Sequence, residues 1–231
     1  MLKNTNLIGL ASADSSGPIF SPGDVYVGVW AGPGTVTVNL PQGTRAVVFA
    51  TGATSKANTN VTSVTLGGVS ATMIVQTYQT QEYYKGSGIW AVNYTGSGPT
   101  TLSFTCAVSA KIMVFALKRQ FATVSASDTA IDVSAGGANA PFVVNLDVHK
   151  DGLVVCAWRT YIWPSSIGSP FTSWYNEHTS WVSSPLSGAI VVPATTEINK
   201  QIIAYAQGDG GKCCDDGATL AIASFSADKF I

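Results

Sequence analysis

The sequence predicts an all-β protein made of two tandem antiparallel β-sandwiches of jelly-roll type that arose by internal duplication. Three observations predict it. Apolar residues alternate or run continuously in short segments, the segments are separated by Gly- and Ser-rich turns, and similar segments recur in the same order in the two halves of the chain. No apolar stripe with helical spacing continues without interruption by Gly, Pro or a β-branched residue.

The individual strands follow from this pattern. Residues 25–29 and 36–40 place apolar side chains at every second position, as expected for half-buried strands. The segments RAVVFA (45–50) and GLVVCAW (152–158) are continuously apolar, which predicts central strands buried on both faces.

The evidence for duplication is a series of three landmarks spaced about 100 to 108 residues apart. The tripeptide VNL occurs at 38–40 and 144–146, and each copy precedes a turn and an apolar run ending in alanine. SGIWAV from Ser87 matches SGAIVV from Ser187, and each half then closes with an apolar strand. We therefore predict an N-terminal sandwich with an additional arm or strand (1–120), a linker and first strand region (121–140) and a C-terminal sandwich (141–231).

The segment SVTLGGVSAT (63–72) reads as a hairpin around Gly67 and Gly68, with arms over residues 61–66 and 69–75. A two-residue hairpin turn needs positive φ, which glycine adopts without steric cost. A phosphate-binding loop would need a lysine or a following helix, and neither is present.

Charge and composition limit the classes of partner. Only 11% of the residues are charged and the formal net charge is −1, without a block of like charge, so no nucleic-acid partner is expected. The chain has no run of about 18 apolar residues and no signal-peptide core near Met1, so we expect no membrane span and synthesis inside a cell. Cys106 and Cys156 lie in strand-like segments and are expected to be buried free thiols.

The series from Val61 to Arg119 resembles a β-sandwich module of structural proteins in tailed bacteriophages. The resemblance rests on the T-L-G-G hairpin, the S-x-I-W strand, a Gly/Ser/Thr turn, T-x-x-F and a final apolar strand, and it covers residues 40–119. The opening NTNLIGLAS is similar to starts of such proteins. The resemblance implies a virion protein made in the host cytoplasm, such as a capsid decoration, head spike or tail component.

An aromatic segment in the second half marks the largest difference between the two copies. The segment runs from Trp158 to Trp181, replaces the Gly-Gly hairpin of the first half and contains four of the six tryptophans. We expect Trp158 to pack in the core, as we do Trp90 in the first half. Exposed aromatic rings are typical of interfaces, so partner contacts are expected from four residues of this segment: Trp163, Trp174, Tyr175 and Trp181.

No pattern indicates catalysis, a metal or a cofactor. His149 and His178 lack further ligands at interpretable spacing, no G-x-S-x-G occurs, and Asp215-Asp216 reads as a solvated turn. Tyr83, Tyr84 and Lys85 are expected to cap a loop.

The sequence thus favours a non-enzymatic virion structural protein that contacts itself, as a homo-oligomer, and other virion proteins. The alternative is a host-receptor or glycan-binding module of a fibre or spike, with a host surface glycan as its partner.

Overall fold

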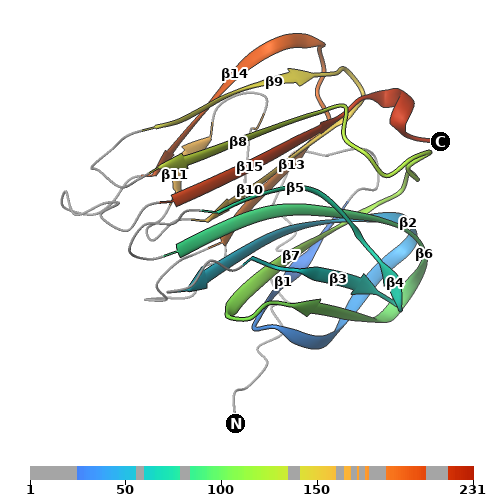
Figure 1. Ribbon diagram of the computed structural model, residues 1–231. Helices are drawn as coiled ribbons and strands as arrows, with labels where there is room; N and C mark the ends of the chain where they lie inside the picture. Colours follow the sequence, from blue (N-terminus) through green and yellow to red (C-terminus); the bar gives the residue numbers. More distant parts are fainter. Residues whose placement is uncertain are drawn as a thin grey trace.

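The computed structural model describes residues 25–55, 60–78, 84–134, 141–159, 164–167, 171, 175–176, 186–206 and 218–231. Apart from one short 3-10 helix, η2 (Ala227–Lys229), the regular elements of these residues are β-strands, and all their pairings are antiparallel (Figure 1). The all-β, antiparallel prediction is therefore confirmed. None of the described residues forms a helix that is long and apolar enough to cross a membrane.

The N-terminal half contains one seven-stranded sheet of order β1-β7-β2-β6-β3-β4, with β5 paired to β6. Its strands are β1 (Val25–Ala31), β2 (Gly34–Ser55), β3 (Ser63–Leu66), β4 (Val69–Ser70), β5 (Thr72–Tyr78), β6 (Tyr84–Thr105) and β7 (Ser109–Leu117).

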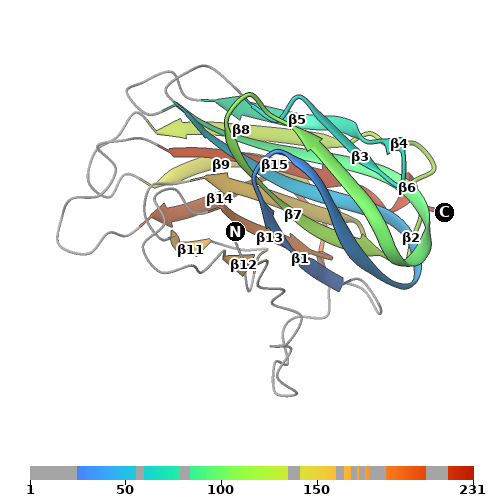
Figure 2. The same ribbon diagram turned by 90° about the horizontal axis from the view of Figure 1, so that it is seen from below.

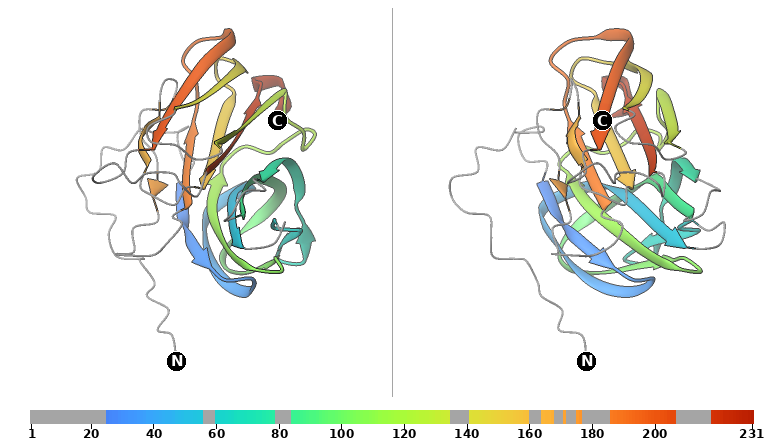
Figure 3. Two further views of the ribbon diagram at one scale, coloured as in Figure 1. Left: turned by 60° about the vertical axis from the view of Figure 1, so that its left-hand side comes forward. Right: turned by 90° about the vertical axis from the view of Figure 1, so that its left-hand side faces the viewer.

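The long strands β2 and β6 bend together, and this bend folds the sheet over on itself (Figure 3). Residues 34–40 of β2 pair with the end of β6, residues 46–55 pair with its beginning, and the register shifts between these two parts. The two parts of the sheet therefore face each other across a core that includes Val38, Phe49, Trp90, Phe104 and Val114.

The C-terminal half contains two sheets packed face to face. One has the order β12-β13-β10-β15-β8 and the other the order β11-β14-β9. The strands are β8 (Asp128–Ser134), β9 (Phe142–Val148), β10 (Leu153–Arg159), β11 (Pro164–Ile167), β12 (Tyr175–Asn176), β13 (Leu186–Val191), β14 (Glu197–Ala206) and β15 (Ala218–Phe225). Strand β8 falls within the predicted linker and first strand region. Residues such as Leu146, Cys156, Trp158, Ile202 and Leu220 fill the space between the two sheets.

A third hydrophobic core joins the two halves. Ala46, Val48 and Ala50 of β2 belong to it, together with Val155 and Ala157 of β10. The residues between them on each strand face that half's own core. Both strands are thus covered on both faces, which confirms the prediction from their continuous apolar runs. The described strands form a stack of four β-layers, with β9 and β14 at one end and β3 and β4 at the other (Figure 1). Figure 2 views the stack from below, so the layers overlap in it.

Small side chains allow the two central layers to approach closely. An ideal Cβ on Gly188 of β13 would lie 3.3 Å from the Cβ of Ala50. Within the same contact, the Ser87 hydroxyl lies 2.7 Å from the Thr219 hydroxyl and donates to the Thr219 carbonyl at 3.0 Å. The two halves therefore contact each other through a packed interior rather than through a solvated surface.

Hydrogen bonds and a cation–π contact fix the segment that connects the two halves. Arg119 donates to the backbone carbonyls of Asp151 and Gly152, at 2.9 Å each, and its guanidinium lies 4.1 Å from the centre of the Phe230 ring. The Asn93 amide exchanges two hydrogen bonds with the backbone of Phe121, at 2.7 and 2.9 Å. These contacts hold the connecting segment and the last residues of the chain against both halves.

Candidate functional site

The predicted aromatic contact segment is described only in part. Trp163, Trp174 and Trp181 lie outside the described residues, whereas Tyr175 lies in β12, whose backbone pairs with β13 at the edge of the five-stranded sheet. A contact role for these four residues stays a prediction.

Trp158 is 2% exposed and packs edge-on against Phe142, with ring centroids 5.7 Å apart, so its predicted place in the core is confirmed. Trp90 is likewise buried.

Gly67 and Gly68 lie at the turn between β3 and β4, with φ of +56° and +82°. The second arm differs from the expected one. It was expected to run over residues 69–75, but β4 ends at Ser70, and the following strand, β5, pairs with β6 instead of β3. The chain leaves the hairpin here because Ile74 and Val75 pack against the core between the halves.

Sequence reasoning missed a group of buried cations. Lys85 was expected to cap a loop, but it lies within β6 and is 1% exposed; Lys111 and Arg159 are buried as well. An ideal Cβ on Gly52 would lie 2.9 Å from Cδ of Arg159, and Gly52 pairs in its sheet with Lys111. Arg159 and Lys111 thus lie at one end of the contact between the halves. The only sequence signal was their position at the ends of apolar strands.

Among the described residues, no three His, Cys, Asp or Glu side chains are grouped as metal ligands would be. His149 lies in a partly exposed turn after β9, and His178 is outside the described part. Cys106 and Cys156 are free and buried as predicted, and burial raises the pKa of both thiols.

Two aspartates close an open edge of the C-terminal half. Asp132 accepts hydrogen bonds from the backbone N–H of Val133 on its own strand and of Val143 on β9, at 2.7 and 2.9 Å. The Asp128 carboxylate likewise accepts hydrogen bonds from the backbone N–H groups of Thr129 and Asp147. Four N–H groups on the neighbouring edges of β8 and β9 are therefore capped by carboxylates, which opposes the addition of another strand there.

A surface of different character covers the other end of the stack. We call it the hydroxyl face: the outward side chains of residues 34–40 and 98–105, together with β3 and β4. The strand register places hydroxyls beside one another across four strands, from Thr35 to Ser103, Thr65 and Ser70. The Thr35 and Ser103 hydroxyls lie 2.8 Å apart. The complete set of its hydroxyl residues is Thr35, Thr37, Ser63, Thr65, Ser70, Thr101, Ser103 and Thr105.

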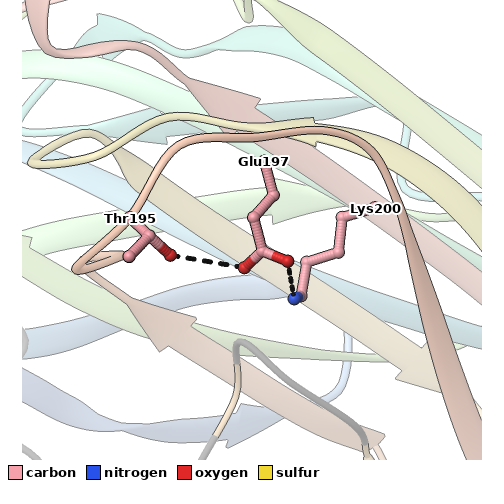
Figure 4. Close-up of polar contacts among 3 residues, drawn as sticks. All are labelled: Thr195, Glu197 and Lys200. Atoms are coloured by element: carbon pink, nitrogen blue, oxygen red, sulfur yellow. Dashed lines mark hydrogen bonds and ion pairs between the residues drawn. The ribbon is translucent and has the colours of Figure 1, made fainter.

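The hydroxyl face carries no formal charge. No Asp, Glu, Lys, Arg or His occurs in residues 25–44, 57–81 or 86–110, which include all the strand segments that form it. By contrast, the opposite outer sheet carries an ion pair between Glu197 and Lys200 on β14, and Thr195 donates a 3.3 Å hydrogen bond to Glu197 (Figure 4). The hydrogen bond from Lys200 holds the pKa of Glu197 below its usual value.

No protein-family model, curated protein or solved structure matches this chain. The functional conclusion therefore rests on the residues themselves.

The hydroxyl face lies over a layer of buried apolar side chains. The hydroxyls of the face lie on strands whose inward side chains, such as Val38, Val64 and Leu102, are fully buried beneath them. Threonine hydroxyls both donate and accept hydrogen bonds, and their β-branched side chains have few rotamers. The face is therefore a supported, neutral surface of hydrogen-bonding groups.

Proposed function

We propose that this chain is a non-enzymatic structural protein of a tailed bacteriophage particle, assembled in several copies as a capsid decoration, head spike or tail component. The observation that carries the proposal is the uncharged hydroxyl face at one end of a closely packed four-layer stack. A structural protein needs a firm body and a surface for neighbours, and this chain provides both. The resemblance of residues 61–119 to phage sandwich modules supports the same assignment.

The absence of charge on the face suits such a role. Contacts between neutral hydroxyl and methyl groups depend little on ionic strength, whereas contacts between exposed ions are screened by salt. A particle that is diluted into media of varying salt content benefits from contacts of the first kind. The partners in this proposal are other copies of the chain and other virion proteins, without nucleic acid, membrane or cofactor.

We further infer that the chain contains two jelly-roll-like domains related by duplication. The order β1-β7-β2-β6-β5 in the first half corresponds to β8-β15-β10-β13-β12 in the second, strand for strand along the chain. Residues 34–40, the end of β6 and β3 correspond in the same way to β9, β14 and β11. This agreement of strand order adds to the sequence landmarks that first indicated a repeat.

The experiment that tests the virion assignment is quantitative mass spectrometry of purified particles of the phage whose genome encodes this chain. We expect its peptides at many copies per particle, at a constant ratio to the major capsid protein through successive density gradients. A non-structural protein from the same infected cells, measured in parallel, controls for carry-over. If purification removes this chain to the same extent as it removes the control protein, the proposal is overturned.

A further inference from the structure

We infer that the hydroxyl face is the surface through which two copies of this chain associate. The inference rests on the proposed function, which requires several copies to assemble, and it names the surface that brings them together. Three observations support it: the chemistry of the face is complementary to itself, its side chains are held in place, and the opposite outer sheet carries formal charge.

Self-complementarity is the first argument. A two-fold contact places the same patch of both copies face to face. Charged side chains near the centre of such a patch would be brought close to their like-charged equivalents in the other copy, which is unfavourable. Hydroxyls avoid this problem because each can donate to and accept from its equivalent. The hydroxyl face lies entirely within residues 25–44, 57–81 and 86–110, which contain no charge.

The second argument is preorganisation. Thr37 and Thr101 are directly opposite each other on β2 and β6, and Thr35 is already hydrogen-bonded to Ser103. Ordering flexible side chains at an interface costs free energy for each one that is immobilised. Threonine on a strand loses little freedom, because χ1 is restricted before binding. The face therefore contains few groups that association would have to order.

The third argument is the contrast with the opposite outer sheet. That sheet carries the Glu197–Lys200 ion pair and Asp147, and its β9 edge is capped by Asp128 and Asp132. Charge at a sheet edge and on its outer face discourages association with another chain. The opposite outer sheet also exposes the apolar side chains of Val143 and Ile198. We choose the neutral face because a two-fold contact through it brings no like charges together.

The dimensions of the face set the expected strength. Residues 34–40 and 98–105 contribute seven and eight residues to the face, whereas β3 contributes four and β4 two. At about 3.3 Å per residue and about 4.8 Å between strands, these segments cover roughly 330 Å² in projection. This area is well below the about 800 Å² per partner of a standard interface, so the contact is expected to be weak. We expect a concentration-dependent dimer in solution, which repetition on a particle would reinforce through multivalency.

Sedimentation velocity over a series of protein concentrations tests the inference. The test variant is Thr37→Lys/Thr101→Lys, which adds two cations at facing positions of β2 and β6 within the face. The matched control is Asn145→Lys/Gln201→Lys, which adds two cations to facing exposed positions on β9 and β14 of the opposite outer sheet. Circular dichroism verifies that both variants are folded.

We expect the full chain to dimerise, the test variant to weaken dimerisation at least tenfold, and the control to dimerise as the wild type does. Raising the salt concentration should change the wild-type dimer little. A wild-type chain that stays monomeric at every concentration overturns the inference, as does a dimer that is equally strong in the test variant.

Binding to a neutral polysaccharide is the competing explanation of a neutral hydroxyl surface. Retention on insoluble neutral polysaccharide by a monomeric wild-type chain, lost in the test variant and kept in the control, would also overturn the inference. These results are independent of particle composition. A chain present in purified particles but monomeric in solution refutes the inference alone, whereas a dimer that is absent from particles refutes only the proposed function.

Discussion

Gly67 and Gly68 share positive φ values, but their surroundings differ. An ideal Cβ on Gly67 would lie 2.6 Å from Cε2 of Tyr94, whereas no atom lies within 4 Å of the equivalent position on Gly68. We expect Gly68→Ala to destabilise the protein by about 1 kcal/mol through backbone strain alone. Gly67→Ala should cost about 2 kcal/mol or more because it must also displace the Tyr94 ring.

Urea denaturation of the two variants measures this difference. Tyr94→Ala/Gly67→Ala is the informative double variant, because removing the ring should leave only the backbone contribution of Gly67→Ala relative to Tyr94→Ala. Equal losses in the two glycine variants would show that the ring moves aside without cost.

Cys156 is buried between the two sheets of the C-terminal half, and burial raises the pKa of its thiol. Only the thiolate reacts readily with alkylating reagents. We expect Cys156 to remain unmodified by iodoacetamide in the native protein near neutral pH and to react once the protein is unfolded. Peptide mapping after alkylation measures this residue separately from the other cysteines. Rapid native labelling of Cys156 would contradict its placement.

Residue-level predictions succeeded where burial follows from local apolar context. Trp90, Trp158 and Cys156 each lie within an apolar strand segment, and each is buried. Lys85 shows the limit of this reasoning. A lysine after two tyrosines suggests an exposed loop, but Lys85 lies two residues before Ser87, whose hydroxyl contacts Thr219 of the second half, and it is buried.

At the scale of elements, Asp128 and Asp132 act on two strands at once. Asp132→Asn keeps the shape of the side chain but replaces one carboxylate oxygen by an amide donor, so it can no longer accept from both Val133 and Val143. We expect a loss of about 1–2 kcal/mol in unfolding free energy. Amide hydrogen exchange should accelerate at Val133 or Val143 and stay unchanged at Val154, in the centre of β10. Uniform acceleration would indicate global destabilisation instead.

Strand positions could be predicted from period-two and continuous apolar patterns, since these reflect burial on one face or on both. The bend that makes β2 and β6 serve two layers could not be predicted, because it depends on register shifts between distant segments. For the same reason the separation of β4 from β5 was missed. The hydroxyls of Thr35, Thr101 and Ser63 are visible in the sequence, but only pairing of their strands shows that they form one face.

At the scale of the whole molecule, Arg119 connects the end of β7 to the turn before β10 and to the C-terminal Phe230. Arg119→Ala removes two charge-assisted hydrogen bonds and a cation–π contact, so we expect the unfolding free energy to fall by about 2–3 kcal/mol. Arg119→Lys should recover only part of this loss, because one ammonium cannot reproduce the two-pronged geometry. Thermal and urea denaturation of both variants measure the effect. Full recovery by lysine would show that charge alone matters.

The third core has the largest consequence for the molecule. A strand in a two-layer sandwich has only one of its faces covered. The continuous apolar runs RAVVFA and GLVVCAW nevertheless predict strands with both faces covered. The additional layer is the other half of the chain, through residues such as Val48, Phe115, Val155 and Ile190. The two halves are therefore repeated in strand order but dependent in stability, because separating them would expose an apolar face on each.

We accordingly expect the chain to unfold in one cooperative transition. Near-ultraviolet circular dichroism reports on the aromatic residues of all three cores, and differential scanning calorimetry reports on the whole chain. The two should give the same midpoint, and the calorimetric and van't Hoff enthalpies should agree. Val155→Asp, which places a charge in the third core, should lower the stability of both halves together, whereas Val69→Asp, at an exposed position of β4, should have little effect. Two separate transitions in the wild type would show that each half is stable without the other.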